Sequence, residues 1–206
     1  MMDESILRRE LLKTLPISRG PLVVRSCQRS DLDLLAAWPA YPDPYSVFTF
    51  SFAHLGPREM DSLHDNRQRQ EDRITLVADH GLANSIAYLA LLEIEWGRRE
   101  SRNMGIRVHP EWCGKGVGGD MLAAVRDWWF ANGMGALRLD VASSNERAVG
   151  CYEKAGFVRS GEFWREASDL IGANLADSKW RFLDGHVRHV SRAPEVRFLL
   201  MELKPG

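Results

Sequence analysis

The order of apolar and polar residues along the chain predicts several strands and a smaller number of amphipathic helices. Apolar runs that end at turn residues predict strands over residues 21–27, 73–79, 85–96, 103–108, 136–142, 157–165 and 196–203. Apolar residues at helical spacing predict helices over 3–15, 30–38, 57–69 and 118–131. A further helix should begin near Ser143, which has the spacing of a capping box with Glu146, and end at Gly156.

The order of these elements predicts a mixed α/β fold of the α+β type. The strands between residues 73 and 108 have no helix between them, so we expect them to pair antiparallel. The strand 103–108, the helix 118–131 and the strand 136–142 can instead form a parallel crossover. We therefore expect a mostly antiparallel central sheet with one parallel strand–helix–strand unit and flanking helices.

Length and punctuation predict one main domain. A chain of 206 residues is typical of a single domain. Gly20 and the prolines around it separate an N-terminal helical extension, residues 1–20, from a domain at 21–206. Residues 166–194 are weakly patterned, apart from a hairpin expected over 179–190, and are interpreted as an insert that covers the site or serves a homodimer.

The balance of charges excludes some functional classes. The chain carries 27 lysines and arginines against 28 acidic residues, and a net charge of −1 argues against nucleic acid as the main partner. No uncharged apolar run reaches the ~18 residues of a membrane span, and the acidic N-terminal residues are unlike a secretory signal. The odd number of cysteines, with no close pair, indicates reduced thiols in the cytoplasm and no structural metal site; they are Cys27, Cys113 and Cys151.

Residues 113–119, with the sequence Cys-Gly-Lys-Gly-Val-Gly-Gly, are the clearest candidate for a binding site. Four glycines stand between a strand and an amphipathic helix, where they allow a ligand to approach the backbone N–H groups. The helix start adds unpaired donors and the positive end of the helix dipole, which together suit a pyrophosphate. The spacing does not match a P-loop, because Lys115 is followed by Gly116 rather than by Ser or Thr.

A dinucleotide-binding site is one alternative. Gly114, Gly116 and Gly119 fit the pattern G-x-G-x-x-G, and Asp140 lies 21 residues further on at a strand end. However, the loop at 109–113 separates these glycines from the strand, whereas that fold needs an almost direct turn. Antiparallel strands also precede the unit, and both features favour another phosphate-binding fold over an NAD-type protein.

Two segments together resemble the GNAT superfamily of N-acetyltransferases. Residues 105–119 (GIRVHPEWCGKGVGG) are similar to its strand, its V-x-P-E loop and its Arg/Gln-x-x-Gly-x-Gly/Ala motif. Residues 145–157 (NERAVGCYEKAGF) are similar to its later motif N-x-x-A-x-x-x-Y-x-x-x-G-F. The segments follow each other in the family's order and at about its spacing. The resemblance implies a GNAT-like fold and a site for acetyl-CoA as cosubstrate.

The resemblance also implies which residues bind the cosubstrate. Loop amides at 114–118 would hold the pyrophosphate, while Ile106 and Val108 would run beside the pantetheine where two parallel strands splay apart. Asn145 matches a position that hydrogen-bonds the pantetheine arm. Cys113 stands where Arg or Gln is usual, so its side chain adds no charge, and Lys115 would supply charge instead. The implied cofactor-binding residues are Ile106, Val108, Cys113, Gly114, Lys115, Gly116, Val117, Gly118 and Asn145.

Acid–base chemistry is assigned to one tyrosine and three glutamates. Tyr152 matches the family's general acid, and an ordinary tyrosine pKa of ~10 keeps a proton available for a leaving thiolate. Arg102 falls near the position of a carboxylate that serves as base in some members, so the base is left open. Glu93 and Glu95 alternate along one strand and Glu100 precedes the next, and any of the three could act directly or through water.

We therefore predict a cytoplasmic N-acetyltransferase that transfers the acetyl group of acetyl-CoA by direct attack of a primary amine on the thioester. The acceptor is a small amine or the N-terminus of a peptide or protein. The main alternative, motivated by Arg102, is a non-catalytic module that senses acyl-CoA, and an NAD-type protein is the less favoured one. No nucleic acid, membrane or metal ion is expected as a partner, and a homodimer is left open.

Overall fold

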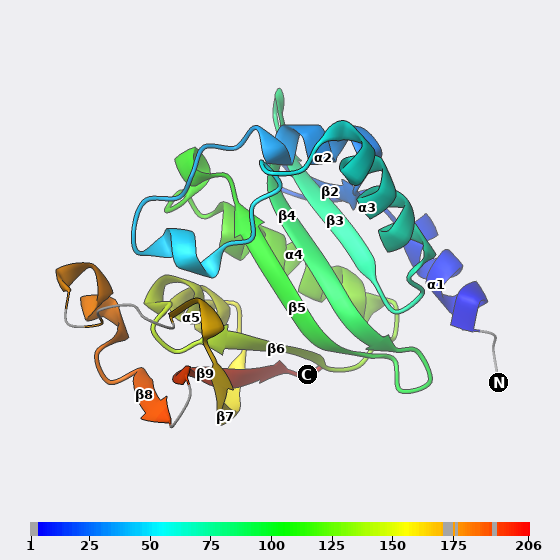
Figure 1. Ribbon diagram of the computed structural model, residues 1–206. Helices are drawn as coiled ribbons and strands as arrows, with labels where there is room; N and C mark the ends of the chain where they lie inside the picture. The colour runs from blue at the N-terminus through cyan, green and yellow to red at the C-terminus, as the bar shows by residue number, and fades with distance from the viewer. Residues whose placement is uncertain (1–3, 171–174, 176, 191–192) are drawn as a thin grey trace.

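The computed structural model describes residues 4–170, 175, 177–190 and 193–206, which form a mixed sheet with helices on both faces (Figure 1). The strands are β1 (Ile17–Arg19), β2 (Leu22–Ser26), β3 (Ile74–His80), β4 (Ala83–Glu95), β5 (Glu100–Val108), β6 (Leu137–Ala142), β7 (Val158–Glu166), β8 (Val187–Val190) and β9 (Ala193–Leu203). The helices are α1 (Glu4–Lys13), α2 (Arg29–Ala36), α3 (Pro57–Arg69), α4 (Val117–Ala131) and α5 (Glu146–Lys154). Within these described residues, no helix is long and apolar enough to cross a membrane.

The sheet is antiparallel except at one junction. Its order is β1-β2-β3-β4-β5-β6-β9-β7, and β8 pairs with β9. Neighbouring strands run antiparallel from β1 to β5 and again from β6 through β9 to β7. β5 and β6 pair in parallel, because the helical connection through α4 returns the chain to the same end of the sheet. The predicted fold class is confirmed.

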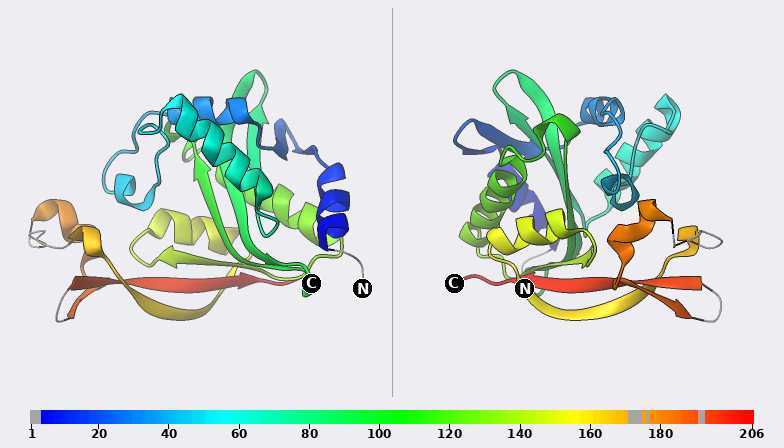
Figure 2. Two further views of the ribbon diagram at one scale, coloured as in Figure 1. Left: turned by 45° about the vertical axis from the view of Figure 1, so that its right-hand side comes forward. Right: turned by 90° about the vertical axis from the view of Figure 1, so that its left-hand side faces the viewer.

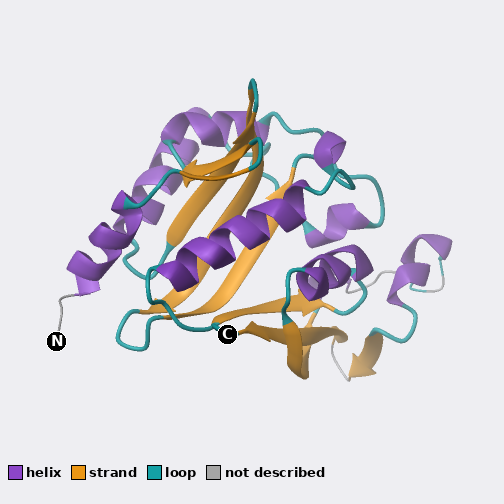
Figure 3. Ribbon diagram, turned by 180° about the vertical axis from the view of Figure 1, so that it is seen from behind, coloured by secondary structure: helices purple, strands orange, loops and turns teal. Residues whose placement is uncertain are grey.

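Helices cover both faces of the sheet (Figure 2 and Figure 3). α4 lies on one face and buries residues at helical spacing, among them Met121, Val125 and Trp129, in the main core. α2 and α3 lie on the other face, where Leu32 and Met60 belong to a second cluster. Successive residues of β3 and β4 point alternately into these two clusters, so the middle of the sheet is buried on both sides.

β5 and β6 separate soon after they meet. Their register pairs Ser101 with Leu137, and the N–H of Ser101 donates to the carbonyl of Ala136 over 3.0 Å. No further register pair joins the two strands in the part of the chain that the structure describes. Figure 1 shows β5 turning away from β6 toward its carboxyl end. Backbone groups along the diverging edge are free of a strand partner and can face a ligand.

The N-terminal extension shares the sheet with the rest of the chain. β1 pairs with β2 across the turn at Gly20, and α1 packs Leu11 into the main core. The sequence pattern did not predict β1, because three residues are too few to show a strand alternation. The domain boundary at residue 20 and the limits of the insert at 166–194 stay predictions.

Two local predictions are wrong. α5 begins at Glu146 with Asn145 as its N-cap, so the expected capping box at Ser143 does not form. The hairpin expected over 179–190 is also absent, because Ser178–Leu183 forms a 3-10 helix and β8 pairs with β9 instead. Local spacing identified turn residues in both places. It did not identify which residue caps α5 or with which strand β8 pairs.

Candidate active site

A cleft of about 700 Å³ opens at the carboxyl end of β5. Its walls are the end of β5, the loop before α4, the first turns of α4, one face of α5 and the segment 41–49. The predicted cofactor-binding residues that line it are Ile106, Val108, Cys113, Gly114, Gly116, Gly118 and Asn145. The fold therefore brings together the two sequence segments, 105–119 and 145–157, on which the family resemblance rests.

The loop before α4 has a backbone conformation that favours glycine. Gly114 has a φ of 78°, and Gly116, the N-cap of α4, has a φ of 88°. A Cβ atom at Gly118 would lie 3.4 Å from Val108 Cγ2 and 3.5 Å from Cys151 Sγ, so a larger side chain there would crowd the cleft. Gly118 belongs to the first turn of α4, whose N–H groups have no partner within the helix. Together, the loop and the helix start fit a diphosphate.

Positive charge reaches the cleft from α5 rather than from the loop. Arg147 and Lys154 line the cleft and lie seven residues apart, on the same helical face. Lys115, the expected source of charge, instead lies with its ammonium 5.3 Å from the ring centroid of Trp112 and does not line the cleft. Val117 is buried in the core, so only its backbone can contact a ligand. Sequence reasoning missed the two basic residues of α5, although their helical spacing was a usable signal.

Aromatic residues of the segment 41–49 form one wall. The Tyr41 hydroxyl donates a hydrogen bond to the backbone carbonyl of Val108, which ties this segment to the end of β5. The Arg147 guanidinium lies 3.9 Å from the ring centroid of Tyr45, a cation–π contact between α5 and the segment. These two contacts hold the segment against both sides of the cleft.

Tyr152 lies where β5 and β6 part. Its side chain is 5% exposed, makes a backbone hydrogen bond with Ile106 of β5 and is within electrostatic reach of Asp140 of β6. Burial raises the pKa of Tyr152 well above its ordinary value, and the neighbouring Cys151 acts in the same direction. The hydroxyl therefore stays protonated at neutral pH. The cleft is lined by Ile106, to which the Tyr152 side chain is hydrogen-bonded, and by the neighbouring Cys151.

Asn145 and two cysteines complete the lining. The Asn145 side-chain oxygen accepts a hydrogen bond from the N–H of Ala148 over 3.3 Å and caps α5. This bond uses the oxygen and leaves the NH₂ group as a donor for a ligand. Burial raises the pKa of the Cys113 and Cys151 thiols. Both thiols are therefore protonated at neutral pH, which does not favour a nucleophilic role.

The structure does not bring the three glutamates predicted as bases to the cleft. Glu93 is exposed and has a left-handed φ of 51° in β4. Glu95 is ion-paired with Arg102 at 2.8 Å, and Glu100 with Arg138 at 2.7 Å. These residues lie at the β4–β5 turn, roughly 25 Å along β5 from the cleft at ~3.3 Å per residue. The sequence pattern predicted the strands near these glutamates, but it did not predict at which end of the sheet the site forms.

Comparisons with known proteins agree with this geometry. Residues 37–157 match the model of the Acetyltransferase (GNAT) family. The spermidine N(1)-acetyltransferase of Vibrio cholerae is 28% identical over 156 residues, which cover 70% of this chain and 83% of that protein. The crystal structure of spermidine N-acetyltransferase from Vibrio cholerae in complex with CoA and spermine gives a TM-score of 0.66 at 21% identity, covering 90% of this chain and 96% of that chain. A structure of spermidine/spermine N-acetyltransferase from Vibrio cholerae in complex with manganese ions gives a TM-score of 0.62 at 21% identity. The match covers 90% of this chain and 93% of that chain.

A parallel strand pair that parts beside a glycine-opened helix is the arrangement of an acyltransferase that uses a coenzyme A thioester. The family match extends over more than half of the chain. The chain belongs to the acetyltransferase (GNAT) family, and it transfers acetyl groups from acetyl-CoA to amines. The predicted family, activity and cosubstrate are confirmed. The comparisons do not support the acyl-CoA sensor or the NAD-type protein, and Asp140, which the latter would use for ribose, is ion-paired with Arg165.

Proposed function

We propose that the cleft at the end of β5 binds acetyl-CoA and presents its thioester to a small primary amine. One observation carries this proposal: a helix start with a left-handed Gly116 lies in the same cleft as the diverging end of β5. The backbone N–H groups at 114–118 would hold the diphosphate, and Arg147 and Lys154 would add positive charge.

The pantetheine arm would lie along the diverging strand. Ile106 and Val108 line the cleft there, and the Asn145 NH₂ group is placed to donate to an amide of the arm. Backbone N–H groups of this part of β5 can face the carbonyl oxygen of the thioester. Holding amine and thioester in one cleft removes much of the entropic barrier, up to ~7–11 kcal/mol in ideal cases.

Tyr152 is proposed as the general acid. Acetyl-CoA supplies an acetyl thioester, whose cleavage requires a proton at sulfur. The buried Tyr152 hydroxyl keeps its proton at neutral pH and lies beside the backbone of β5 where the two strands part. No base is assigned to Glu93, Glu95 or Glu100, because they lie at the other end of β5; solvent water takes the amine proton.

The acceptor proposed is a small amine. The relatives described above are named for spermidine and spermine, which supports an acceptor of this size. The N-terminus of a peptide or protein stays a second prediction. Aromatic side chains at the mouth, among them Tyr41, Tyr45 and Phe48, give the acceptor an apolar wall.

Two further predictions concern the setting of the enzyme. We propose a cytoplasmic location, which the three free cysteines support. We also propose a homodimer, because Val158 and Leu200 expose apolar surface on β7 and β9, with 63% and 40% of each residue accessible. Light scattering of the purified chain tests the dimer, and a monomer at micromolar concentration would contradict it.

The activity is tested by calorimetry followed by an acceptor screen. Titration with coenzyme A and acetyl-CoA should show binding at micromolar to millimolar concentration. Release of free thiol should then accompany acetylation of one or more amines in a panel of small amines and peptides. Absence of binding at millimolar ligand would contradict the proposed cleft, and binding without thiol release from any amine would contradict the proposed transfer.

A further inference from the structure

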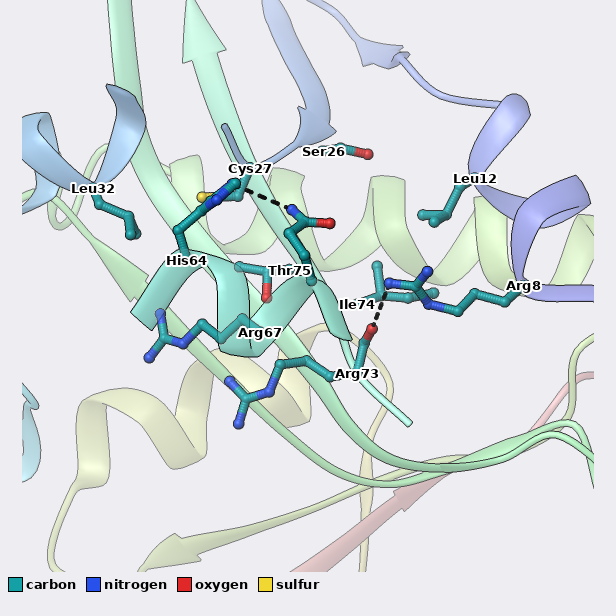
Figure 4. A pocket seen from close by; sticks show the side chains of 11 residues that line it. Arg8, Leu12, Ser26, Cys27, Leu32, His64, Arg67, Arg73, Ile74 and Thr75 are labelled. Carbon is teal, nitrogen blue, oxygen red and sulfur yellow. Dashed lines mark hydrogen bonds between the residues drawn. The ribbon is translucent and has the colours of Figure 1, made fainter. Parts of the chain in front are cut away.

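A second cavity lies away from the acetyl-CoA cleft, between α1, α3, the end of β2 and the start of β3 (Figure 4). Its volume is about 40 Å³. Arg8 of α1, His64 and Arg67 of α3, and Arg73, which immediately precedes β3, line it. We name this cavity, defined by these four residues, the arginine pocket. A cavity of this size holds a few water molecules or one oxyanion group, since ~10–15 Å³ is enough for a water.

The arginines of the arginine pocket form no ion pairs among the described residues, although Asp72 acts electrostatically on Arg73 from the neighbouring position. No carboxylate lines the pocket, and in the part of the chain that the structure describes no ion pair joins Arg8, Arg67 or Arg73 to an acidic residue. Arg25 shows the contrast, because Asp31 and Asp79 both hold it at 2.7 Å. Three guanidinium groups around one small cavity repel one another, and a bound anion offsets that repulsion.

Few hydrogen-bonding groups of these arginines are used within the protein. Arg8 Nε is buried and has no hydrogen-bond partner among the described residues, while Arg8 Nη2 reaches only the carbonyl of Arg73, at 3.5 Å. Arg67 Nη1 donates to the Tyr88 hydroxyl over 3.1 Å, and the Arg73 guanidinium also hydrogen-bonds the Tyr88 side chain. Figure 4 shows the Arg67 and Arg73 side chains side by side, while Arg8 comes from α1 and points to the backbone carbonyl of Arg73. Each guanidinium carries five N–H donors, so most of them remain for a ligand.

We propose that the arginine pocket binds the carboxylate or phosphate group of a small anionic ligand. Guanidinium groups match these groups in geometry, because their planar donors form paired, charge-assisted hydrogen bonds with two oxygens at once. Burial lowers the pKa of the half-buried Arg73, and charge-assisted hydrogen bonds are stronger where water is partly excluded. A polycation is disfavoured there by the same charges.

One aromatic ring connects the arginine pocket to the acetyl-CoA cleft. The Arg67 guanidinium lies 5.2 Å from the ring centroid of Phe52, and Arg107, which lines the cleft, also lies 5.2 Å from that centroid. The anionic group belongs either to the amine acceptor or to a separate molecule, and the experiment distinguishes these two sources. The inference goes beyond acetyl transfer, and the binding site stands whether or not the cleft acts as proposed.

Calorimetry with inorganic phosphate and with succinate tests the arginine pocket. We expect the chain to bind at least one of the two at millimolar concentration or below, and Arg73→Gln to weaken this binding at least about tenfold, because a charge-assisted bond is lost. Arg69→Gln is the matched control: this exposed arginine lies on α3 outside the pocket, and its loss should leave the affinity unchanged.

Arg8→Gln gives a second test if Arg73→Gln does not fold, because its charge comes from a different helix. Absence of binding in the unaltered chain, or an affinity in Arg8→Gln and Arg73→Gln that equals that of the unaltered chain, would overturn the proposal. The source of the anion is distinguished by transfer rates with an amino acid and with its amide. If Arg73→Gln raises the KM for the amino acid but not for its amide, the anion bound in the arginine pocket is the carboxylate of the acceptor. Unchanged KM values, with phosphate or succinate binding lost, identify a separate anion.

Discussion

The acetyl-CoA cleft and the arginine pocket both suit anions, but different groups build them. In the cleft, the donors proposed for a diphosphate are backbone amides of consecutive residues, 114–118, held by two glycines with left-handed φ. In the arginine pocket, the donors are side chains, and Arg8 and Arg73 are 65 residues apart. A site of backbone amides depends on conformation and tolerates changes of side chain. A site of side chains depends on each charge, so substitutions should affect the two sites in different ways.

Gly116→Val should have the largest effect, because it changes the conformation on which the cleft depends. A β-branched residue at a φ of 88° costs roughly 1–3 kcal/mol of backbone strain and also crowds the loop. We expect the affinity for coenzyme A, measured by calorimetry, to fall at least ~100-fold. Gly185→Val is the control, since Gly185 has a φ of 74° outside the cleft and should lose stability without losing affinity. Normal affinity in Gly116→Val would contradict diphosphate binding by the backbone N–H groups of this loop.

Tyr152→Phe should have the next largest effect, and on turnover rather than on binding. We expect kcat to fall about tenfold to 100-fold, because the proton for the leaving sulfur is lost, while the affinity for coenzyme A changes little. The protonated hydroxyl is the active form and its pKa is raised, so ionisation of Tyr152 should not reduce the rate of the unaltered enzyme below pH ~10. Tyr88→Phe, at a buried tyrosine outside the cleft, should keep kcat within about threefold. An unchanged kcat in Tyr152→Phe would exclude the proposed acid.

Substitutions of Asn145 should have smaller effects, and two variants distinguish capping of α5 by its side-chain oxygen from ligand binding by its NH₂ group. Asn145→Ala should lower the free energy of unfolding by about 0.5–2 kcal/mol, since the cap of α5 is lost, and should also weaken coenzyme A binding. Asn145→Ser keeps a capping oxygen but removes the NH₂ donor, so it should weaken binding by about tenfold with little loss of stability. Thermal melting and calorimetry measure the two effects. Full affinity in Asn145→Ser would mean that the NH₂ group does not contact the ligand.

Cys113→Ala should have the smallest effect. Its thiol is protonated and half-buried, and the donors proposed for the diphosphate are the backbone N–H groups of the residues that follow it, 114–118. The affinity for coenzyme A should therefore change less than about threefold in the same titration. A large loss would show that the side chain at this position takes part after all. Such a result would weaken the contrast between a cleft of backbone donors and a pocket of side chains.

The cleft was largely predictable from the sequence, because its demands on the backbone are local. Positive φ values and a ligand's close approach require glycine, and Gly114, Gly116 and Gly118 follow one another within a few residues of a helix start. The order of strands and helices likewise predicted antiparallel pairs where no helix intervenes and one parallel crossover where a helix does. The predicted bases failed for a different reason. Glu93 and Glu95 were placed on the correct strand, but the pattern does not say which end of a strand carries the site.

The sequence by itself determined the order of strands and helices, the glycine loop and the family, since each depends on residues close together in the chain. The tertiary structure decided which side chains meet across the sheet. It turned Lys115 onto Trp112, brought Arg147 and Lys154 to the cleft, and gathered Arg8, Arg67 and Arg73 around a cavity without a carboxylate. Backbone conformation is a property of a few neighbouring residues, whereas a meeting of distant side chains depends on strand order and helix packing, which local patterns do not contain.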